Sequence, residues 1–360
     1  MSIRINVDFP GGSVVVRGYR DRERKVLLRQ DTWGSSIKFL YFYFEAESDD
    51  TDWYDFDFVS GYSVSSGGVA YSLDRGVTWD HLPFGAGSDR FGFRYFMQKN
   101  QPVRFCLGQQ FLQADLERFL TETPAIRREV LCRSIGKREV ELLRLGSDAP
   151  GRIPVLLTAR HHACEMHGTQ VMMGLLAAAA ADPDFRKRYT VYAVPFVDKD
   201  GVEEGLQGKA RIPHDHNRDY GDPSIYPEVR ALKALDEEKH FQIVLDFHCP
   251  RLYREKIFFF GSQYPRIERN IEELCDLIGV YGPTWLNFNR DDLVKFGFGH
   301  NLPYRDGVAC ARYFAAQPWN KLSACNEISY DFANGHLLTV AKLREYGKGI
   351  ADAMMHLTLQ

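Results

Sequence analysis

Hydrophobic positions follow two different rhythms along the chain. Up to about residue 110, short apolar runs and alternating patterns predict β-strands separated by glycine-containing turns. Phe91, Phe93 and Tyr95 alternate along the chain, and residues 37–44 form a run rich in aromatic residues. Because no long helical pattern occurs in this part, it predicts an antiparallel β-sandwich.

Beyond residue 150, longer apolar runs are separated by helical stretches, and a short helix is expected before them at residues 113–120. Strands that alternate with helices predict an α/β domain, here with a mixed, largely parallel sheet flanked by helices. We therefore place a β-sandwich domain at residues 1–122 and the α/β domain at residues 123–360. The expected strands are 153–159, 189–197, 241–247 and 256–260, and the expected helices are 168–181, 227–240, 265–281 and 335–357.

Length, charge and cysteine spacing argue against several classes of protein, namely nucleic-acid-binding, secreted and membrane-spanning ones. The 360 residues include 45 Lys and Arg and 48 Asp and Glu, which give a formal net charge of −3. We expect no nucleic-acid partner, because binding by charge needs a basic excess. The start of the chain does not predict a secretory signal, and the most apolar stretch, 171–181, is far shorter than the ~20 residues that span a bilayer. Seven scattered cysteines predict free thiols and a cytoplasmic location. The oligomeric state is left open.

Candidate metal ligands follow two of the predicted strands. Ligands of open α/β sheets bind beyond the carboxyl ends of the strands. His162 and Glu165, spaced as His-x-x-Glu, follow the strand at 153–159, and His248 follows the strand at 241–247. Two imidazoles and one carboxylate are a donor set of open catalytic zinc sites. Buried histidines are more often hydrogen-bonded core residues, so the pattern alone favours that interpretation and leaves the metal site open.

Two further features favour a functional site. Residues 214–220 form a polar cluster that is too rich in charge for a core segment. Glu327 lies in an otherwise weakly polar predicted strand, where a buried carboxylate is costly unless a cation or a polarised water meets it. Cys164 and Cys249 adjoin proposed ligands, but neighbouring side chains of a strand point apart, which disfavours thiolate ligation.

The ordered motifs resemble the zinc metallocarboxypeptidase family, and within it the cytosolic carboxypeptidase-like branch of bacterial type. The H-x-x-E and distant His of that family are similar to His162, Glu165 and His248. Its D-G-V…N-R segment is similar to residues 200–218, and its late catalytic glutamate is similar to Glu327. The resemblance implies one Zn²⁺ per chain and a substrate with a free C-terminal tail, either a peptide or a protein.

The resemblance also implies roles for single residues. Glu327 would act as general base and then as general acid. Asn217 and Arg218 would bind the terminal carboxylate of the substrate, for which the planar guanidinium of arginine is well suited. Asp215 matches a carboxylate that orients a metal-binding histidine.

One position departs from the branch. A gapless comparison places Gly208 where the branch has an arginine that stabilises the oxyanion. Lys209 and Arg211 flank it, and we prefer Arg211, because a guanidinium can donate twice. Arg312 either meets an acidic substrate side chain or forms a structural ion pair.

The proton-donating tyrosine of the family cannot be assigned, with Tyr304 and Tyr313 as equal candidates.

Two alternative functions stay open. One is a zinc-dependent deacylase of N-acyl amino acids, and the other is a non-catalytic peptide- or glycan-binding protein on the same fold. The second draws on residues 72–79, which fit the S-x-D-x-G-x-T-W pattern of the sialidase Asp-box. Since repeat folds show repeats and this motif occurs once, we interpret it as a hairpin device.

Overall fold

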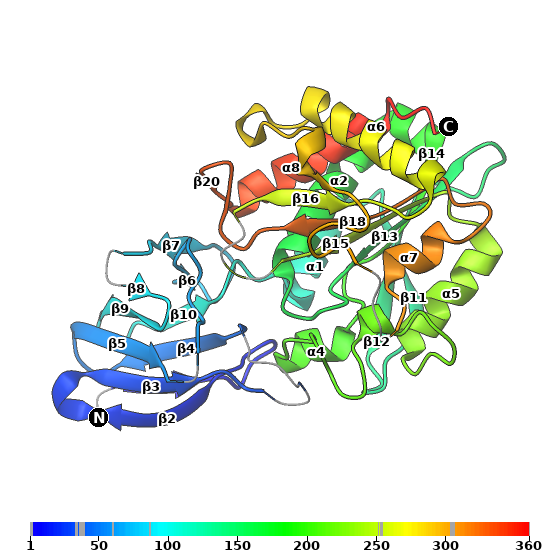
Figure 1. The fold of residues 1–360 in the computed structure, drawn as a ribbon. Helices are drawn as coiled ribbons and strands as arrows, with labels where there is room; N and C mark the ends of the chain where they lie inside the picture. Colours follow the sequence, from blue (N-terminus) through cyan, green and yellow to red (C-terminus); the bar gives the residue numbers. More distant parts are fainter. Residues whose placement is uncertain are drawn as a thin grey trace.

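Two facing five-stranded sheets form the amino-terminal part of the computed structural model (Figure 1), which describes residues 3–32, 35, 40–59, 61–85, 88–250, 252, 255–302 and 307–359. The sheet orders are β1-β4-β10-β6-β7 and β2-β3-β5-β9-β8. The strands are β1 (Ile3–Asn6), β2 (Val15–Arg20), β3 (Lys25–Arg29), β4 (Tyr43–Ser48), β5 (Asp52–Phe58), β6 (Val69–Ser72), β7 (Asp80–Leu82), β8 (Ser88–Asp89), β9 (Gly92–Met97) and β10 (Val103–Cys106).

Aromatic side chains from both sheets fill the space between them. The ring centroids of Phe56 and Phe93 lie 4.8 Å apart, and those of Phe93 and Phe105 lie 4.9 Å apart. The predicted sandwich is confirmed, although β3 and β5 pair in parallel. Of the apolar run at 37–44, residues 37–39 lie outside the described part, and Tyr43 and Phe44 begin β4.

The Asp-box motif closes the connection from β6 to β7. Asp74 accepts hydrogen bonds from the hydroxyl of Ser72 (2.7 Å), from the backbone N–H groups of Val77 and Thr78, and from the hydroxyl of Thr78 (2.6 Å). The side chain therefore replaces the backbone partners that a tight turn lacks. This geometry supports the hairpin interpretation.

An eight-stranded mixed sheet organises the rest of the chain, in the order β11-β12-β14-β13-β15-β18-β16-β17. Its centre is parallel, because β13 pairs in parallel with β14 and β15, and β15 pairs in parallel with β18. The strands are β11 (Arg127–Arg133), β12 (Glu139–Leu145), β13 (Ile153–Ala159), β14 (Tyr189–Val194), β15 (Ile243–His248), β16 (Ile257–Phe260), β17 (Leu293–Val294) and β18 (Leu322–Ile328), with a small separate pair β19 (Phe332–Ala333) and β20 (His336–Leu337).

Helices cover both faces of this sheet (Figure 1). Val155 and Leu157 belong to the core that contains α2 and α8, whereas Leu156 belongs to a second core that contains α5 and α7. Burial on both faces explains the continuous apolar strands. The helix expected at 335–357 begins later, because Thr339 accepts the backbone N–H of Lys342 as the N-cap. The helices are α1 (Gln113–Glu122), α2 (Met166–Ala181), α3 (Pro183–Arg188), α4 (Lys199–Glu204), α5 (Pro227–Lys239), α6 (Pro265–Tyr281), α7 (Cys310–Ala315) and α8 (Val340–Met354).

The sandwich and the α/β part are joined by a continuous hydrophobic core and by polar contacts. A single cluster of buried residues extends from the sandwich to α2 and α8. The backbone N–H of Leu40 donates to Gln207 Oε1 (2.6 Å), and Ser66 Oγ donates to Asp331 Oδ2 (3.0 Å). Helix α1 ends at Glu122, and a domain boundary between residues 122 and 123 stays a prediction.

All seven cysteines are free, as their spacing predicts. Among the described helices, none combines the length and the apolar character that crossing a bilayer requires.

We expect Asp74→Ala to destabilise the protein by about 1 kcal/mol, because the donors in the β6–β7 turn lose their acceptor. Burial raises the pKa of Asp74, but hydrogen bonds from Thr78 and Ser72 outweigh it and lower this pKa to about 2. The stabilisation is therefore present above the pKa of the unfolded carboxyl group and is lost as the pH falls towards 2. Urea unfolding of the variant and of Asp49→Ala, an exposed carboxylate of the same sandwich, measures the effect. Equal midpoints for both would contradict this role.

Candidate metal and catalytic site

The carboxyl ends of three parallel strands meet at one edge of the sheet. Ala159 at the end of β13 pairs with Phe247 on β15, and His248 at the end of β15 pairs with Glu327 on β18. The segment that follows β13 carries His162, so residues far apart in the sequence reach the same place. This is the edge at which ligands bind in open α/β sheets.

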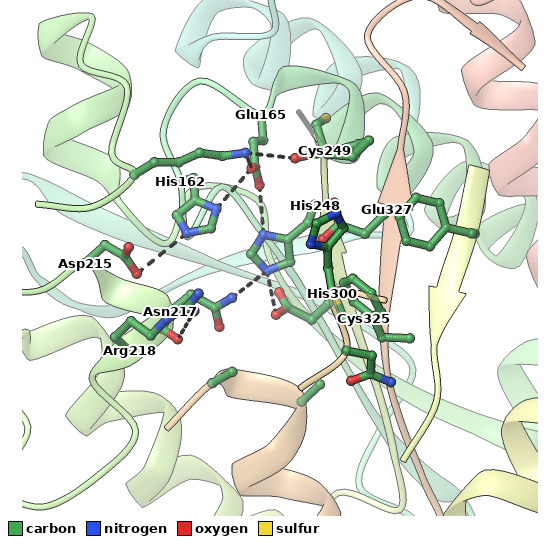
Figure 2. Close-up of a pocket in the computed structure, with 18 of the residues that line it drawn as sticks. His162, Glu165, Asp215, Asn217, Arg218, His248, Cys249, His300, Cys325 and Glu327 are labelled. Carbon is green, nitrogen blue, oxygen red and sulfur yellow. Dashed lines mark hydrogen bonds and ion pairs between the residues drawn. The ribbon is translucent and has the colours of Figure 1, made fainter. Parts of the chain in front are cut away.

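His162, Glu165 and His248 form a compact group of possible metal donors, whose ligand atoms all lie within 4.8 Å of one another. Glu165 Oε1 lies 3.0 Å from His162 Nδ1, and Glu165 Oε2 lies 2.8 Å from His248 Nδ1 (Figure 2). Burial raises the pKa of Glu165, but the positive charges of His162, Lys209 and His248 outweigh it and lower this pKa well below its usual range. The structure thus brings together the three predicted ligands, and their metal-binding role stays a prediction.

Each of the two imidazoles has a carboxylate behind it. His162 Nε2 lies 3.6 Å from Asp215 Oδ1, as predicted for a residue that orients a ligand (Figure 2). His248 Nε2 lies 2.7 Å from Asp246 Oδ2, a contact that the sequence reasoning missed. The sequence contained a signal for this contact. Asp246 and His248 are two residues apart at the end of one predicted strand, so their side chains lie on the same face. Carboxylates in these positions hold a ring nitrogen protonated and leave Nδ1 free to bind a metal.

Asp246 also anchors a second, fully buried histidine. Its Oδ1 lies 2.9 Å from His161 Nδ1, and His161 Nε2 lies 2.7 Å from the hydroxyl of Tyr220. Burial lowers the pKa of His161 although Asp246 opposes this. His161, Asp246 and His248 are also close enough to hold an ion, but His161 is fully buried and does not line the cavity that His162, Glu165 and His248 share. We interpret this group as the support of His248.

Glu327 contributes a carboxylate oxygen that suits a metal or a water molecule. Its Oε2 atom is buried, and the described residues offer it no hydrogen-bond partner. Burial and the negative charge of Glu165 raise the pKa of Glu327, while His248 opposes the shift. Together with the nitrogen and oxygen donors of the neighbouring group, this unpartnered oxygen fits a zinc site and its water.

The loop before Asp215 places the two candidate oxyanion donors differently. Arg211, our preferred oxyanion-stabilising residue, does not line the cleft, and its Nη1 is held by Asp198 Oδ1 (3.0 Å) and Oδ2 (3.1 Å). Lys209 lies there instead, with its Nζ 2.6 Å from Glu165 Oε1. Burial opposes ionisation of Lys209, but the charge of Glu165 raises its pKa above the ordinary value.

Gly208 cannot carry the arginine that the family resemblance places there. Its φ is +79°, and a Cβ atom would lie 2.3 Å from the backbone nitrogen of Ala163. A side chain at this position would therefore displace the segment that carries His162.

The predicted substrate-binding residues line the same cleft, which has a volume of about 1090 Å³. Asn217 and Arg218 lie on one wall, where Asn217 Oδ1 accepts the backbone N–H of Cys310 (2.9 Å) and Arg218 Nη1 donates to the backbone oxygen of Asn217 (2.9 Å). Arg312 also lines the cleft, donates to the backbone oxygen of Leu302 and lies 5.3 Å from the ring centroid of Phe296.

The cysteines considered as metal ligands and the tyrosines considered as proton donors are less well placed. Burial raises the pKa of the Cys164 thiol to about 11 and that of Cys249 well above its usual value, which keeps both thiols protonated. Tyr313 packs against Tyr220 and does not line the cleft, and Tyr304 lies outside the described residues. Tyr264 does line the cleft, and nothing in its sequence context pointed to it.

No protein-family model matches the chain. Cytosolic carboxypeptidase 6 of Caenorhabditis elegans is 25% identical over 251 residues, which cover 61% of this chain and 54% of the relative. Human cytosolic carboxypeptidase 2 is 29% identical over 149 residues, or 37% of this chain and 16% of the relative. The chain thus spans about half, or less, of the length of the curated relatives that it matches.

Solved structures match the whole chain. A metallo-carboxypeptidase from Pseudomonas aeruginosa, solved with (2-guanidinoethylmercapto)succinic acid, has a TM-score of 0.80 at 21% identity and covers 98% of both chains. A metallo-carboxypeptidase from Burkholderia cenocepacia has a TM-score of 0.79 at 19% identity, with 99% of this chain and 98% of that one covered. These likenesses show that the sandwich and the α/β part occur together in the same fold. The chain is thus similar in sequence to cytosolic carboxypeptidases and in fold to metallo-carboxypeptidases.

Proposed function

We propose that this protein is a zinc-dependent carboxypeptidase that removes the C-terminal residue from a peptide or a protein tail. The supporting observation is that His162, Glu165 and His248 converge beside the unpartnered oxygen of Glu327 in an open cleft. A cytoplasmic location is part of this proposal, supported by the names of the relatives and by the free cysteines.

His162, Glu165 and His248 would hold one zinc ion per chain. When bound, zinc acts as a Lewis acid that polarises the scissile carbonyl and lowers the pKa of water. Glu327 takes the proton of the attacking water and delivers it to the leaving amine. The described residues offer no hydrogen-bond donor to its Oε2 atom, which is therefore available to accept that proton.

Cationic side chains around the cleft would position the substrate and its developing charge. Arg218, assisted by Asn217, binds the free terminal carboxylate, which restricts cleavage to chain ends. Lys209 lines the cleft, and its Nζ contacts Glu165 Oε1 (2.6 Å) and the backbone oxygen of Cys249 (3.0 Å). Since an ammonium group has three donors, one remains to donate to the oxyanion. Arg312 faces the side chain of the terminal residue.

The zinc-loaded protein should release the C-terminal amino acid from peptides with a free carboxylate and leave C-terminally amidated peptides intact. A chelator should abolish the release, and added Zn²⁺ should restore it. Mass spectrometry of a peptide library with varied C-terminal residues measures both effects. Hydrolysis of N-acyl amino acids without peptide cleavage would favour the deacylase alternative. Bound peptide without turnover would favour a binding protein.

Glu327→Gln should retain one zinc ion per chain and lose about 100- to 10,000-fold in kcat, because the amide cannot accept the proton of water. Metal content by elemental analysis and steady-state kinetics test this. Glu237→Gln, at an exposed position on α5, is the matched control and should keep full activity. Normal turnover by Glu327→Gln would refute the mechanism.

Lys209→Met should lower kcat about 100- to 1000-fold with a small change in KM, as expected when an oxyanion donor is lost. Arg211→Met should affect kcat much less, because its guanidinium is committed to Asp198. Kinetics of the two variants at equal zinc content distinguish the residues. A larger loss for Arg211→Met would restore Arg211 as the oxyanion donor.

A further inference from the structure

The β-sandwich supplies part of the cleft wall. Val59, Tyr62 and Phe91 line the same cavity as His248 and Glu327. Their side chains are unusually open to solvent, with exposed fractions of 56%, 52% and 50%. We call these three residues, two of them aromatic and one aliphatic, the aromatic ledge.

The ledge is held in place by its own backbone. The N–H of Val59 donates to the carbonyl of Leu28 (2.9 Å), and the N–H of Phe58 donates to the carbonyl of Phe91 (2.6 Å). The ring centroids of Tyr62 and Phe91 lie 5.3 Å apart with an interplanar angle of 44°. Apolar groups fixed in this way form a binding surface that needs little ordering when a ligand arrives.

The position of the ledge indicates which part of a substrate it meets. The residues proposed to hold the C-terminal residue, Asn217, Arg218 and Arg312, all come from the α/β part. A carboxypeptidase substrate has one residue after the scissile bond, and every other residue lies before it. A cleft of about 1090 Å³ has room for several residues. The wall that the sandwich contributes is therefore available to the upstream residues.

We propose that the aromatic ledge binds apolar side chains of the substrate peptide on the amino-terminal side of the scissile bond. This inference rests on the proposed function and adds a substrate class to it, namely extended tails with an aromatic or aliphatic residue upstream of the cleavage point. The exposed rings gain free energy when such a side chain covers them.

The double variant Tyr62→Ala/Phe91→Ala tests the proposal with two peptides that share their last two residues. One is an N-terminally blocked dipeptide, and the other is an octapeptide with leucine and phenylalanine upstream. We expect kcat/KM for the octapeptide to fall about tenfold or more, the effect of uncovering apolar surface of this size, and kcat/KM for the dipeptide to stay unchanged. Trp53→Ala/Phe96→Ala removes another exposed aromatic pair of the sandwich, which lies outside the cleft lining, and should change neither value.

An equal loss for both peptides, or no loss for either, would overturn the role of the ledge. If the unmodified zinc-loaded protein cleaves neither peptide, the proposed function fails, and binding then decides the question of the ledge. Fluorescence anisotropy of the octapeptide, labelled at its amino terminus, measures that binding without turnover. Weaker binding by Tyr62→Ala/Phe91→Ala than by the unmodified protein supports the ledge, and equal binding refutes it.

Discussion

The parallel register of β13, β15 and β18 sets the relative positions of the proposed metal ligands and the proposed base. Pairing of His248 with Glu327 places the proposed ligand next to the proposed base, and the pairing of β13 with β15 brings the His162 segment to the same edge. Because side chains alternate along a strand, a slip of one residue would turn His248 and Glu327 to opposite faces. The apolar packing on both faces of the sheet therefore protects the geometry of the site as well as the stability of the fold.

Charge balance is the second constraint on the site. Glu165 lies between two imidazole rings, and Asp215 and Asp246 lie on their far sides. Each of these three buried carboxylates has at least one ring or cation beside it, which offsets the cost of burying its charge. The carboxylates behind the rings also determine which nitrogen carries the proton, so that the Nδ1 atoms are presented to the same point.

Local patterns were sufficient to predict the residues that sit at strand ends. His162, Glu165, His248 and Glu327 follow or occupy apolar strands, and the rule that ligands gather at carboxyl ends places them together without knowledge of the loops. The helices expected at 168–181, 227–240 and 265–281 were also close to the observed bounds. Each of these segments either has a clear apolar face or is long enough to be recognised as a helix.

The oxyanion donor could not be predicted in this way. The choice between Lys209 and Arg211 depends on the path of the loop through Gly208, which is set by close packing against Ala163 and by the ion pair of Arg211 with Asp198. Both are tertiary contacts between segments distant in sequence. The same holds for the ledge, because nothing near Tyr62 or Phe91 in the sequence shows that the sandwich faces the catalytic edge.

The hydrogen bonds of Leu40 with Gln207 and of Ser66 with Asp331, together with the shared core, join the sandwich firmly to the α/β part. The cleft between these two parts has a volume of about 1090 Å³, which is a small fraction of that of a folded domain. Under the proposed function, such a cleft would accept a tail that is already unstructured, and a terminus packed within a folded domain would be spared whatever its sequence.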